Sequence, residues 1–199
     1  MVQNIIVIGM GMLGFMYNNL FLYIYKYIYK MEKTDEYYFH QTPVELAKLL
    51  IKEVDLVDGD KVLEPFKGEG AFYDNLPEFV EKDWCEIVDG RDYKNHNKEI
   101  DWIISNPPFA LRENDKKINA FHTLTEYFAG RVNKGIAFLG NDYCLSCLTP
   151  KRMKVINDKH NLYIHKVIVC SIKKWRGRYF FIIFKKGYSE FYKTIDGNF

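Results

Sequence analysis

The sequence predicts a doubly wound α/β fold, built on a mostly parallel sheet that ends in a C-terminal antiparallel hairpin. A strand at residues 60–64 is expected to run into a glycine-bearing loop, and a short buried strand at 102–105 is expected to run into a rigid polar turn. Two strand-like segments at 164–172 and 178–184 are separated by only a few residues, as in a hairpin. In folds of this kind, ligands bind at the carboxyl ends of the strands.

The composition fits one domain with a basic C-terminal third. The chain has 199 residues, 48% of them hydrophobic, so a packed core is feasible. The formal net charge is only +2, but residues 151–186 carry eleven lysines and arginines against one acid. Residues 1–150 carry sixteen against 23 acids. A basic region on an acidic body suggests a face that meets phosphates, although a solvated lysine-rich surface would have the same composition.

Residues 1–30 differ from the rest, and residues 31–199 are predicted to form the folded domain. The first 25 residues carry no charged side chain and contain three glycines spaced as in the Gly-x-Gly-x-x-Gly fingerprint. Three interpretations stay open. The segment is a disordered extension or an artefact ahead of a true start at Met31, or it associates with a membrane, which its length would span. The third interpretation is a dinucleotide-binding loop, but such a loop requires a second strand and an acidic residue after it, and neither is evident here.

Four cysteines give no disulfide framework, and we expect free thiols in a reducing compartment. Cys144 and Cys147 have the spacing of half a zinc site, but no second pair or suitable histidine cluster completes it. No metal site is therefore predicted. The expected location is the cytoplasm, or the host cytoplasm or nucleus for a viral chain.

The folded domain is expected to open with a capped helix at residues 44–51. Thr42 is a suitable N-cap, and Pro43 suits the first helical position. The apolar face of this helix comprises Val44, Ala47, Leu50 and Ile51.

A glycine-bearing loop follows the strand at residues 60–64, and a helix is expected from Ala71 onward. The loop reads Glu64-Pro65-Phe66-Lys67-Gly68-Glu69-Gly70. Glycines permit positive φ angles and close approach of the backbone to a ligand. The N–H groups at the start of a helix would bind a carboxylate. A phosphate-binding P-loop is excluded, because no Gly-Lys-Ser/Thr follows.

The turn Asn106-Pro107-Pro108-Phe109 carries the residue types that would hold a planar NH2 group. The Asn106 amide offers an oxygen acceptor, and the prolines have fixed φ angles and carbonyls that only accept hydrogen bonds. The Phe109 ring offers a stacking surface. Because two acceptors leave the nitrogen lone pair available for attack, no Cys, Ser or metal is required. An ordinary strand-ending turn is the alternative.

The remaining elements are a polar loop, two helices and three strands. Residues 110–119 are expected to form a mobile loop over the substrate, followed by a helix at 121–129, a buried strand at 135–140 and a helix capped by Thr149. The turn of the final hairpin contains Lys173, Lys174, Trp175, Arg176 and Arg178. Basic residues around an aromatic suit phosphate neutralisation and base stacking, although Trp175 could instead pack under the sheet edge.

The order of a Thr-Pro helix, Glu-Pro-x-x-Gly-x-Gly-Ala-Phe and Asn-Pro-Pro-Phe resembles class I S-adenosylmethionine-dependent amino-methyltransferases, above all the N6-adenine type. The resemblance covers roughly residues 36–187 and implies a Rossmann-like fold. It implies that the catalytic residues are Asn106, Pro107, Pro108 and Phe109. It implies that S-adenosylmethionine is bound by Thr42, Pro43, Glu64, Pro65, Gly68, Gly70, Phe72, Glu86, Asp92 and Asn106.

The resemblance also assigns roles to the acids around a second strand, which is expected at Trp84–Ile87. Glu86 would accept both ribose hydroxyls, and Asp92 would accept from the cofactor adenine amine. Asp89 is a rival, and each acid could be a surface turn residue. Only about twenty residues separate Glu86 from Asn106, so the helix and third strand usual in the family are compressed or missing.

The expected substrate is adenine N6 in nucleic acid, with DNA favoured over RNA. The family also includes enzymes that methylate RNA or a protein glutamine amide, and a non-catalytic binding subunit would keep the same motifs. No sizeable target-recognition region follows the last strand, so strict sequence specificity is not expected. No membrane partner is expected unless residues 1–30 are inserted, and the oligomeric state stays open.

Overall fold

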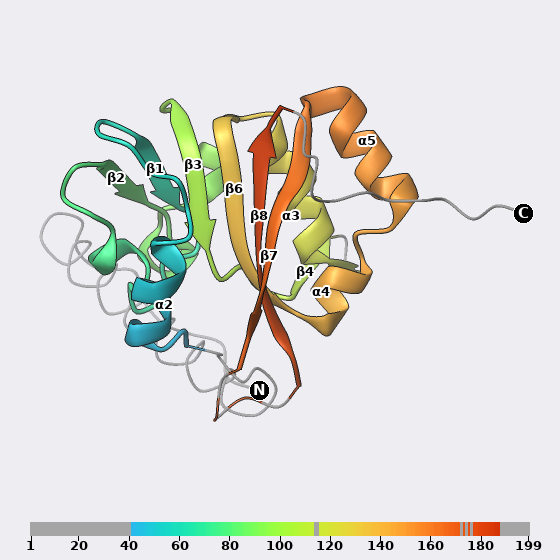
Figure 1. Ribbon diagram of the computed structural model, residues 1–199, viewed down its shortest axis with the longest axis horizontal. Helices are drawn as coiled ribbons and strands as arrows, with labels where there is room; N and C mark the ends of the chain where they lie inside the picture. The colour runs from blue at the N-terminus through green and yellow to red at the C-terminus, as the bar shows by residue number, and fades with distance from the viewer. Residues whose placement is uncertain (1–40, 114–115, 172, 174, 176, 188–199) are drawn as a thin grey trace, which may run out of the picture. The chain divides into compact units, whose positions relative to one another are not determined.

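A computed structural model describes residues 41–113, 116–171, 173, 175 and 177–187 (Figure 1). The N-terminal segment, Lys174 and Arg176 lie outside these residues, so their predicted roles stay predictions. Within the described part of the chain, no helix has the length and hydropathy needed to cross a bilayer.

A six-stranded sheet in the order β2-β1-β3-β6-β8-β7 forms the centre of the fold. Its strands are β1 (Lys61–Glu64), β2 (Glu81–Trp84), β3 (Ile100–Ser105), β6 (Val132–Asn141), β7 (Leu162–Cys170) and β8 (Tyr179–Lys186). The first four strands of the sheet order are parallel to one another, whereas β8 is antiparallel to both β6 and β7. The predicted α/β fold with a C-terminal antiparallel hairpin is therefore confirmed.

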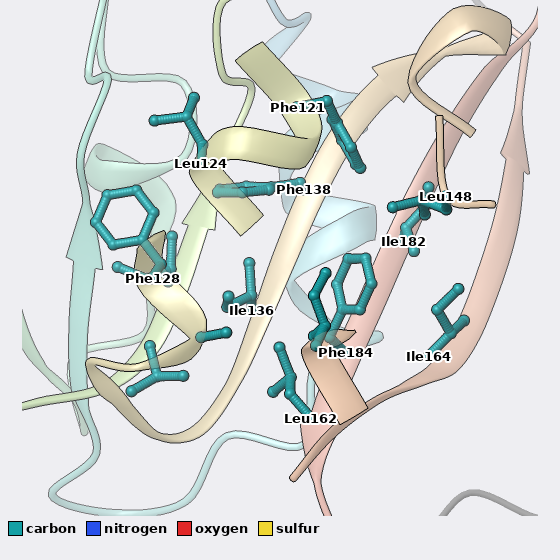
Figure 2. Packing of buried hydrophobic residues seen from close by; sticks show 14 of the residues in the cluster. Phe121, Leu124, Phe128, Ile136, Phe138, Leu148, Leu162, Ile164, Ile182 and Phe184 are labelled. Atoms are coloured by element: carbon teal, nitrogen blue, oxygen red, sulfur yellow. The ribbon is translucent and has the colours of Figure 1, made fainter. Parts of the chain in front are cut away.

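Helices cover both faces of the sheet, giving three layers (Figure 1). The helices are α2 (Val44–Ile51), α3 (Ala120–Ala129), α4 (Asp142–Ser146) and α5 (Pro150–His160). Buried residues of α3 and α5 pack on one face, where Phe128 and Phe138 belong to the same cluster (Figure 2). Buried residues of α2 pack on the other face with Phe181 and Trp102.

The alternation of side chains along β8 shows why the hairpin enters the sheet. Residues at even positions, Phe180, Ile182 and Phe184, face the α3 side. Residues at odd positions, Tyr179, Phe181 and Ile183, face the α2 side. Both sets are buried, because side chains of a strand point alternately to the two faces and both faces are covered by helices.

Two predicted elements differ from the structure near the glycine loop. The helix expected from Ala71 is only a 3₁₀ turn, η1 (Tyr73–Asn75). Pro77 disfavours a helical conformation at the residue before it, and Leu76 is extended with ψ 142°. The second strand ends at Trp84, earlier than expected, because β2 pairs in parallel register with β1 and Glu86 lies beyond that pairing.

The start of α2 also differs from the predicted cap. Pro43, not Thr42, occupies the N-cap position, with φ −59° and ψ 134°, and no side chain caps the helix. The Pro43 carbonyl accepts the first helical hydrogen bond from Ala47 N–H at 3.0 Å. Proline fits this position because its fixed φ is compatible with an extended entry to the helix. Thr42 is buried, whereas Val44 on the predicted apolar face is exposed.

The polar stretch after Phe109 forms two strands rather than the predicted loop. β4 (Ala110–Glu113) and β5 (Lys116–Asn119) pair antiparallel in a separate two-stranded sheet. Leu111 lies opposite Ile118 and packs against the core. This apolar pair gives the otherwise polar segment one side that can be buried.

Candidate functional site

The glycine loop and the Asn106 turn lie side by side at the carboxyl ends of neighbouring strands. β1 precedes the loop, β3 precedes the turn, and the two strands pair in parallel with Leu63 opposite Ile103. The residues that follow each strand therefore emerge at the same edge of the sheet. This is the edge at which open α/β sheets bind ligands.

The glycine loop requires its two glycines for different reasons. Gly68 has φ +53° and Gly70 has φ +84°, a region that residues with a Cβ rarely adopt. A Cβ at Gly70 would also lie 2.5 Å from Asp74 Oδ2, so the loop closes tightly there. A Cβ at Gly68 would lie 3.6 Å from Gln41 Oε1. Gln41 therefore lies over the loop, although its sequence context gave no indication of this contact.

Glu86 is held against the loop, whereas Asp89 is exposed. The Glu86 carboxylate accepts hydrogen bonds from Gly68 N–H at 2.9 Å and from Val88 N–H at 3.3 Å. Since a carboxylate has about four acceptor positions, it retains capacity for two hydroxyl donors. Asp89 ends the 3₁₀ turn η2 (Ile87–Asp89). Glu86 is therefore the acid that this geometry fixes beside the glycine loop.

Ile87 is a large apolar residue beside this carboxylate, and its side chain is 65% exposed. It was not predicted as a site residue. Asp92 caps a second 3₁₀ turn, η3 (Tyr93–Asn95), by accepting from Lys94 N–H at 2.9 Å. Tyr93 packs edge-on against Phe66, with ring centroids 5.1 Å apart.

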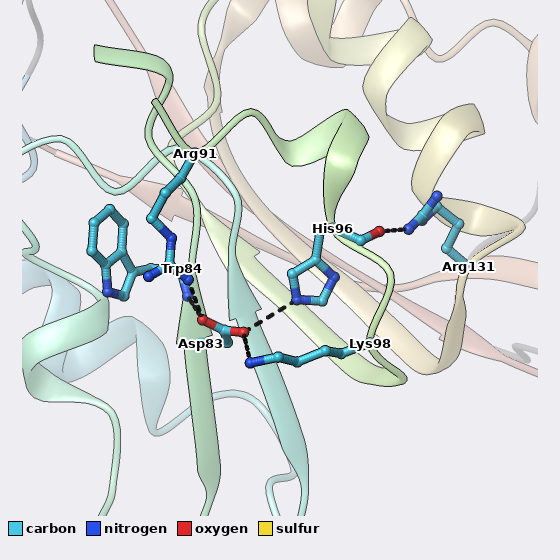
Figure 3. Close-up of polar contacts among 6 residues, drawn as sticks. All are labelled: Asp83, Trp84, Arg91, His96, Lys98 and Arg131. Carbon is cyan, nitrogen blue, oxygen red and sulfur yellow. Dashed lines mark hydrogen bonds and ion pairs between the residues drawn. The ribbon is translucent and has the colours of Figure 1, made fainter. Parts of the chain in front are cut away.

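The connection between β2 and β3 contains only these two 3₁₀ turns, as the short spacing predicted. The carboxylate of Asp83 in β2 holds this connection in place through its polar contacts (Figure 3). Its carboxylate oxygens lie 2.6 Å from Arg91 Nη2, 2.7 Å from Lys98 Nζ and 3.4 Å from His96 Nε2. Burial would raise the pKa of Asp83, but hydrogen bonds from Lys98 and Trp84 N–H together with the charge of Arg91 outweigh it and lower the pKa to about 2.

Glu64 lies at the end of β1 and is only 2% exposed. Its carboxyl group accepts a hydrogen bond from Tyr73 N–H at 2.7 Å. Burial raises the pKa of Glu64 to about 8, although the hydrogen bond from Tyr73 opposes the shift. A cationic group placed beside this carboxyl would favour its ionised form.

Two other residues predicted to bind cofactor, Pro65 and Phe72, are buried. Pro65 is buried, and Phe72 is 1% exposed and stacks on Phe181 with centroids 6.1 Å apart. We assign Phe72 to core packing rather than to cofactor contact, because it has almost no surface to offer a ligand.

The four residues of the Asn106 turn differ in their exposure. Asn106 is half-buried and its Oδ1 atom is buried, Pro107 is buried and Pro108 is exposed. Phe109 is half-buried and packs against both core clusters, which fixes its ring beside the turn. The Asn106 side chain and the Phe109 ring are each partly accessible to a planar group, whereas the buried Oδ1 atom would have to become exposed to accept a hydrogen bond from it.

The basic hairpin turn reaches the same edge of the sheet. Asn141, the last residue of β6, pairs with Tyr179 at the start of β8, so the described residues of the turn, Lys173, Trp175, Gly177 and Arg178, lie past the carboxyl end of β6. Lys173 and Arg178 are exposed. Arg178 Nε lies 3.1 Å from Asp142 Oδ1. Trp175 is half-buried and packs on the Tyr179 ring at 4.6 Å, which favours the packing alternative for this residue.

The cysteines of the described domain do not form disulfides. All four are free and buried. Burial raises the pKa of the Cys144 thiol to about 12 and also raises the pKa of Cys85 and Cys170. Among the residues that the structure describes, no group of three or more His, Cys, Asp or Glu side chains could hold a metal ion.

A pocket of about 200 Å³ lies elsewhere, under the connection between β2 and β3. Lys61 and Glu81 in its lining begin β1 and β2, so it lies toward the amino ends of these strands. Its charged lining includes Lys98 and Glu99, which are already engaged in ion pairs. The pocket therefore offers no unpaired charge for a ligand among these groups, and it is separate from the site at the carboxyl ends.

Comparisons with known proteins support the fold. No protein-family model and no curated protein matches the chain. A candidate class I S-adenosylmethionine-dependent methyltransferase from Listeria monocytogenes aligns with 90% of this chain and 69% of its own, with TM-score 0.59 and 16% identity. The modification subunit of a candidate type I restriction enzyme from Vibrio vulnificus aligns with 86% of this chain, with TM-score 0.57 and 13% identity. This chain covers 50% of that subunit. The chain therefore has the Rossmann-like fold of class I methyltransferases.

Proposed function

We propose that this protein transfers a methyl group from S-adenosylmethionine to an amino nitrogen, and that the acceptor is adenine N6 in DNA. The observation that carries the proposal is the shared edge of β1 and β3, where the Gly68 loop and the Asn106 turn emerge from neighbouring strands. A site for a diol-bearing cofactor and a site for a planar amine thus adjoin each other.

The residues of the cofactor half fit S-adenosylmethionine by their chemistry. Glu86 retains acceptor capacity for a ribose diol beside Gly68. Ile87 offers an exposed apolar surface to a purine ring, and Asp92 can still accept from an amine. The buried carboxyl of Glu64 suits a nearby positive charge. S-adenosylmethionine supplies an electrophilic methyl group on a positively charged sulfur.

The residues of the substrate half hold and orient the amine. Asn106 Oδ1 and the Pro107 carbonyl accept its two N–H donors, and Phe109 packs against the plane of the base. With both protons engaged, the nitrogen lone pair would form the new bond to the methyl carbon as the carbon–sulfur bond breaks. The neutral thioether S-adenosylhomocysteine would be the leaving group, and the surplus proton would pass to water. In duplex DNA the base would have to leave the stack to reach Asn106.

DNA is favoured over a protein acceptor because Lys173 and Arg178 are exposed at the same edge. RNA has the same backbone charge, so it is the second candidate. A non-catalytic subunit with this fold would bind cofactor without transferring the methyl group.

The test is transfer of tritiated methyl from S-adenosylmethionine to DNA, RNA and protein pools side by side. We expect label in DNA and a loss of at least about 100-fold in the Asn106→Ala variant, by analogy with removal of one catalytic hydrogen-bonding group. Cofactor affinity should persist in that variant. The matched control is Asn97→Ala, an exposed asparagine before β3. An Asn106→Ala variant with full activity, or label only in protein, contradicts the proposal.

A further inference from the structure

Tyr143 is an exposed aromatic residue in the short helix α4, directly after the end of β6. Its side chain is 58% exposed. β6 lies between β3 and β8 in the sheet. The helix that follows β6 therefore begins between the turn that follows β3 and the hairpin that precedes β8. No sequence motif pointed to this residue.

One set of contacts ties α4 to the Asn106 turn. Ala110, which follows Phe109 directly, pairs with Asn119 across β4 and β5. The Asn119 side-chain amide donates to Cys147 Sγ. The backbone N–H of Cys147 in turn donates to the Tyr143 carbonyl at 3.1 Å. The catalytic turn and Tyr143 are thus linked through short consecutive contacts.

A second contact ties α4 to the basic hairpin. Asp142, the neighbour of Tyr143, forms the ion pair with Arg178. Asn141 pairs with Tyr179, and the Trp175 ring packs on the ring of Tyr179. Tyr143 therefore lies between the two parts of the site that are proposed to hold the target base and to meet phosphates.

The backbone that carries Tyr143 is fixed. The Asn141 side chain accepts from Cys144 N–H at 3.1 Å. Cys144 is fully buried, and a Cβ at Gly140 would lie 2.7 Å from the Cys144 Cβ. Because α4 packs this closely on the strand, its backbone has little freedom and Tyr143 is presented at a defined position.

We propose that Tyr143 is a base-stacking residue that holds a nucleobase next to the one bound at Asn106. This rests on the proposed function in that the ligand is a nucleic acid. A tyrosine ring can stack on any base, so the contact needs no sequence specificity. Its exposed neighbours Asp142 and Ser146 are polar, which suits a flat base better than an apolar protein surface. Lys173 supplies positive charge for the backbone, and Arg178 balances the Asp142 carboxylate beside Tyr143.

The test uses an oligothymidylate with one central 2-aminopurine, and the matching oligouridylate, because stacking quenches 2-aminopurine fluorescence. We expect the wild-type chain to bind and quench, and Tyr143→Ala to bind about tenfold more weakly with loss of quenching. Tyr143→Phe should behave as wild type. The control is Phe79→Ala, which removes a 47% exposed aromatic residue before β2, at the opposite end of the parallel strands. The melting temperatures of the Tyr143 variants should match that of the wild type, since the side chain is exposed.

Unchanged affinity and quenching in Tyr143→Ala would overturn the assignment, and so would a wild-type chain that binds neither oligonucleotide. A different result would separate the two proposals. If the oligonucleotide binds and Tyr143→Ala weakens binding and quenching as expected, but no methyl group is transferred to DNA, RNA or protein, the proposed function is overturned and the stacking role stands. Quenching confined to the deoxy or the ribo probe identifies the polymer that carries the base.

Discussion

Replacement of Glu64 with glutamine should remove a pH dependence that the buried carboxyl imposes on folding. Glu64 is almost fully buried and its pKa is raised to about 8. The ordinary value, 4.5, applies to the unfolded chain. Between these values the folded chain binds a proton that the unfolded chain has lost. The contribution of Glu64 to stability is therefore complete below about pH 4.5 and is lost as the pH rises to about 8.

The size of the effect follows from the width of this window. Each pH unit inside it changes the free energy of unfolding by about 1.4 kcal/mol, so the whole window is worth on the order of 4–5 kcal/mol. Glutamine keeps the shape and one acceptor oxygen for Tyr73 N–H but cannot ionise. The variant should thus gain stability relative to the wild type as the pH rises.

Urea unfolding of both proteins without cofactor, at pH 5, 6, 7 and 8, measures this difference. We expect the free energy of unfolding of Glu64→Gln minus that of the wild type to increase by about 1.4 kcal/mol per unit between pH 5 and pH 7. Glu69→Gln is the control, because Glu69 is exposed in the same loop. A difference that stays constant across the series would refute the raised pKa and the suitability of Glu64 for a cationic ligand.

Two further substitutions test contacts that position the site and close the fold. Asp83→Asn should lower the affinity for S-adenosylmethionine about tenfold and stability at neutral pH by about 2 kcal/mol, because it weakens the contacts to Arg91 and Lys98. Calorimetric titration with S-adenosylmethionine checks this, with Glu81→Gln as the control variant. Unchanged affinity in Asp83→Asn would show that the contacts of Asp83 do not position the cofactor site. Lys186→Met should cost about 2 kcal/mol in denaturant unfolding, because Lys186 Nζ donates at 2.7 Å to the carbonyls of Ala129 and His160 near the ends of α3 and α5. Loss of the surface pair in Lys185→Met should cost less than about 1 kcal/mol, and equal losses in both variants would contradict the capping role.

The sheet and its final hairpin could be predicted because local and global signals agree along these strands. Buried strands such as β3 and β8 are nearly continuous apolar runs, as strands covered on both faces must be. α5 begins where Thr149 and Pro150 predict, and the Thr149 hydroxyl accepts from Arg152 N–H at 3.4 Å. Propensity, pattern and capping point to the same structure in these elements.

Elements at the edges of the fold were less predictable because distant contacts decide them. β2 consists of Glu81-Lys82-Asp83-Trp84, which has little apolar pattern and is a strand because it pairs with β1. The segment after Ala71 has enough apolar residues for a helix, yet Pro77 allows only a 3₁₀ turn. Charged residues on an edge strand such as β2 also discourage pairing with another chain.

The residues of the candidate site also fall into those that local sequence predicts and those that only distant contacts define. Motifs predict Gly68, Glu86 and Asn106 as site residues, since their residue types suit the proposed chemistry. Nothing in the sequence marked Gln41 or Tyr143, because each owes its place to packing between segments far apart in the chain. The choice between Glu86 and Asp89 likewise depends on the hydrogen bond from Gly68 N–H, which is a tertiary contact.

The two halves of the proposed site follow strands that differ in pairing and burial. Asn106 follows β3, which is paired on both sides and almost fully buried. Glu86 and Asp92 follow β2, an edge strand of four residues, and the connection that carries them contains two 3₁₀ turns. That connection contains no α-helix and is held by the ion pairs of Asp83 and by the ring contacts of Tyr93 with Phe66, Tyr127 and Phe128. Because it follows a short edge strand, whereas β3 is paired on both sides, we expect the proposed cofactor half to open more readily than the Asn106 turn.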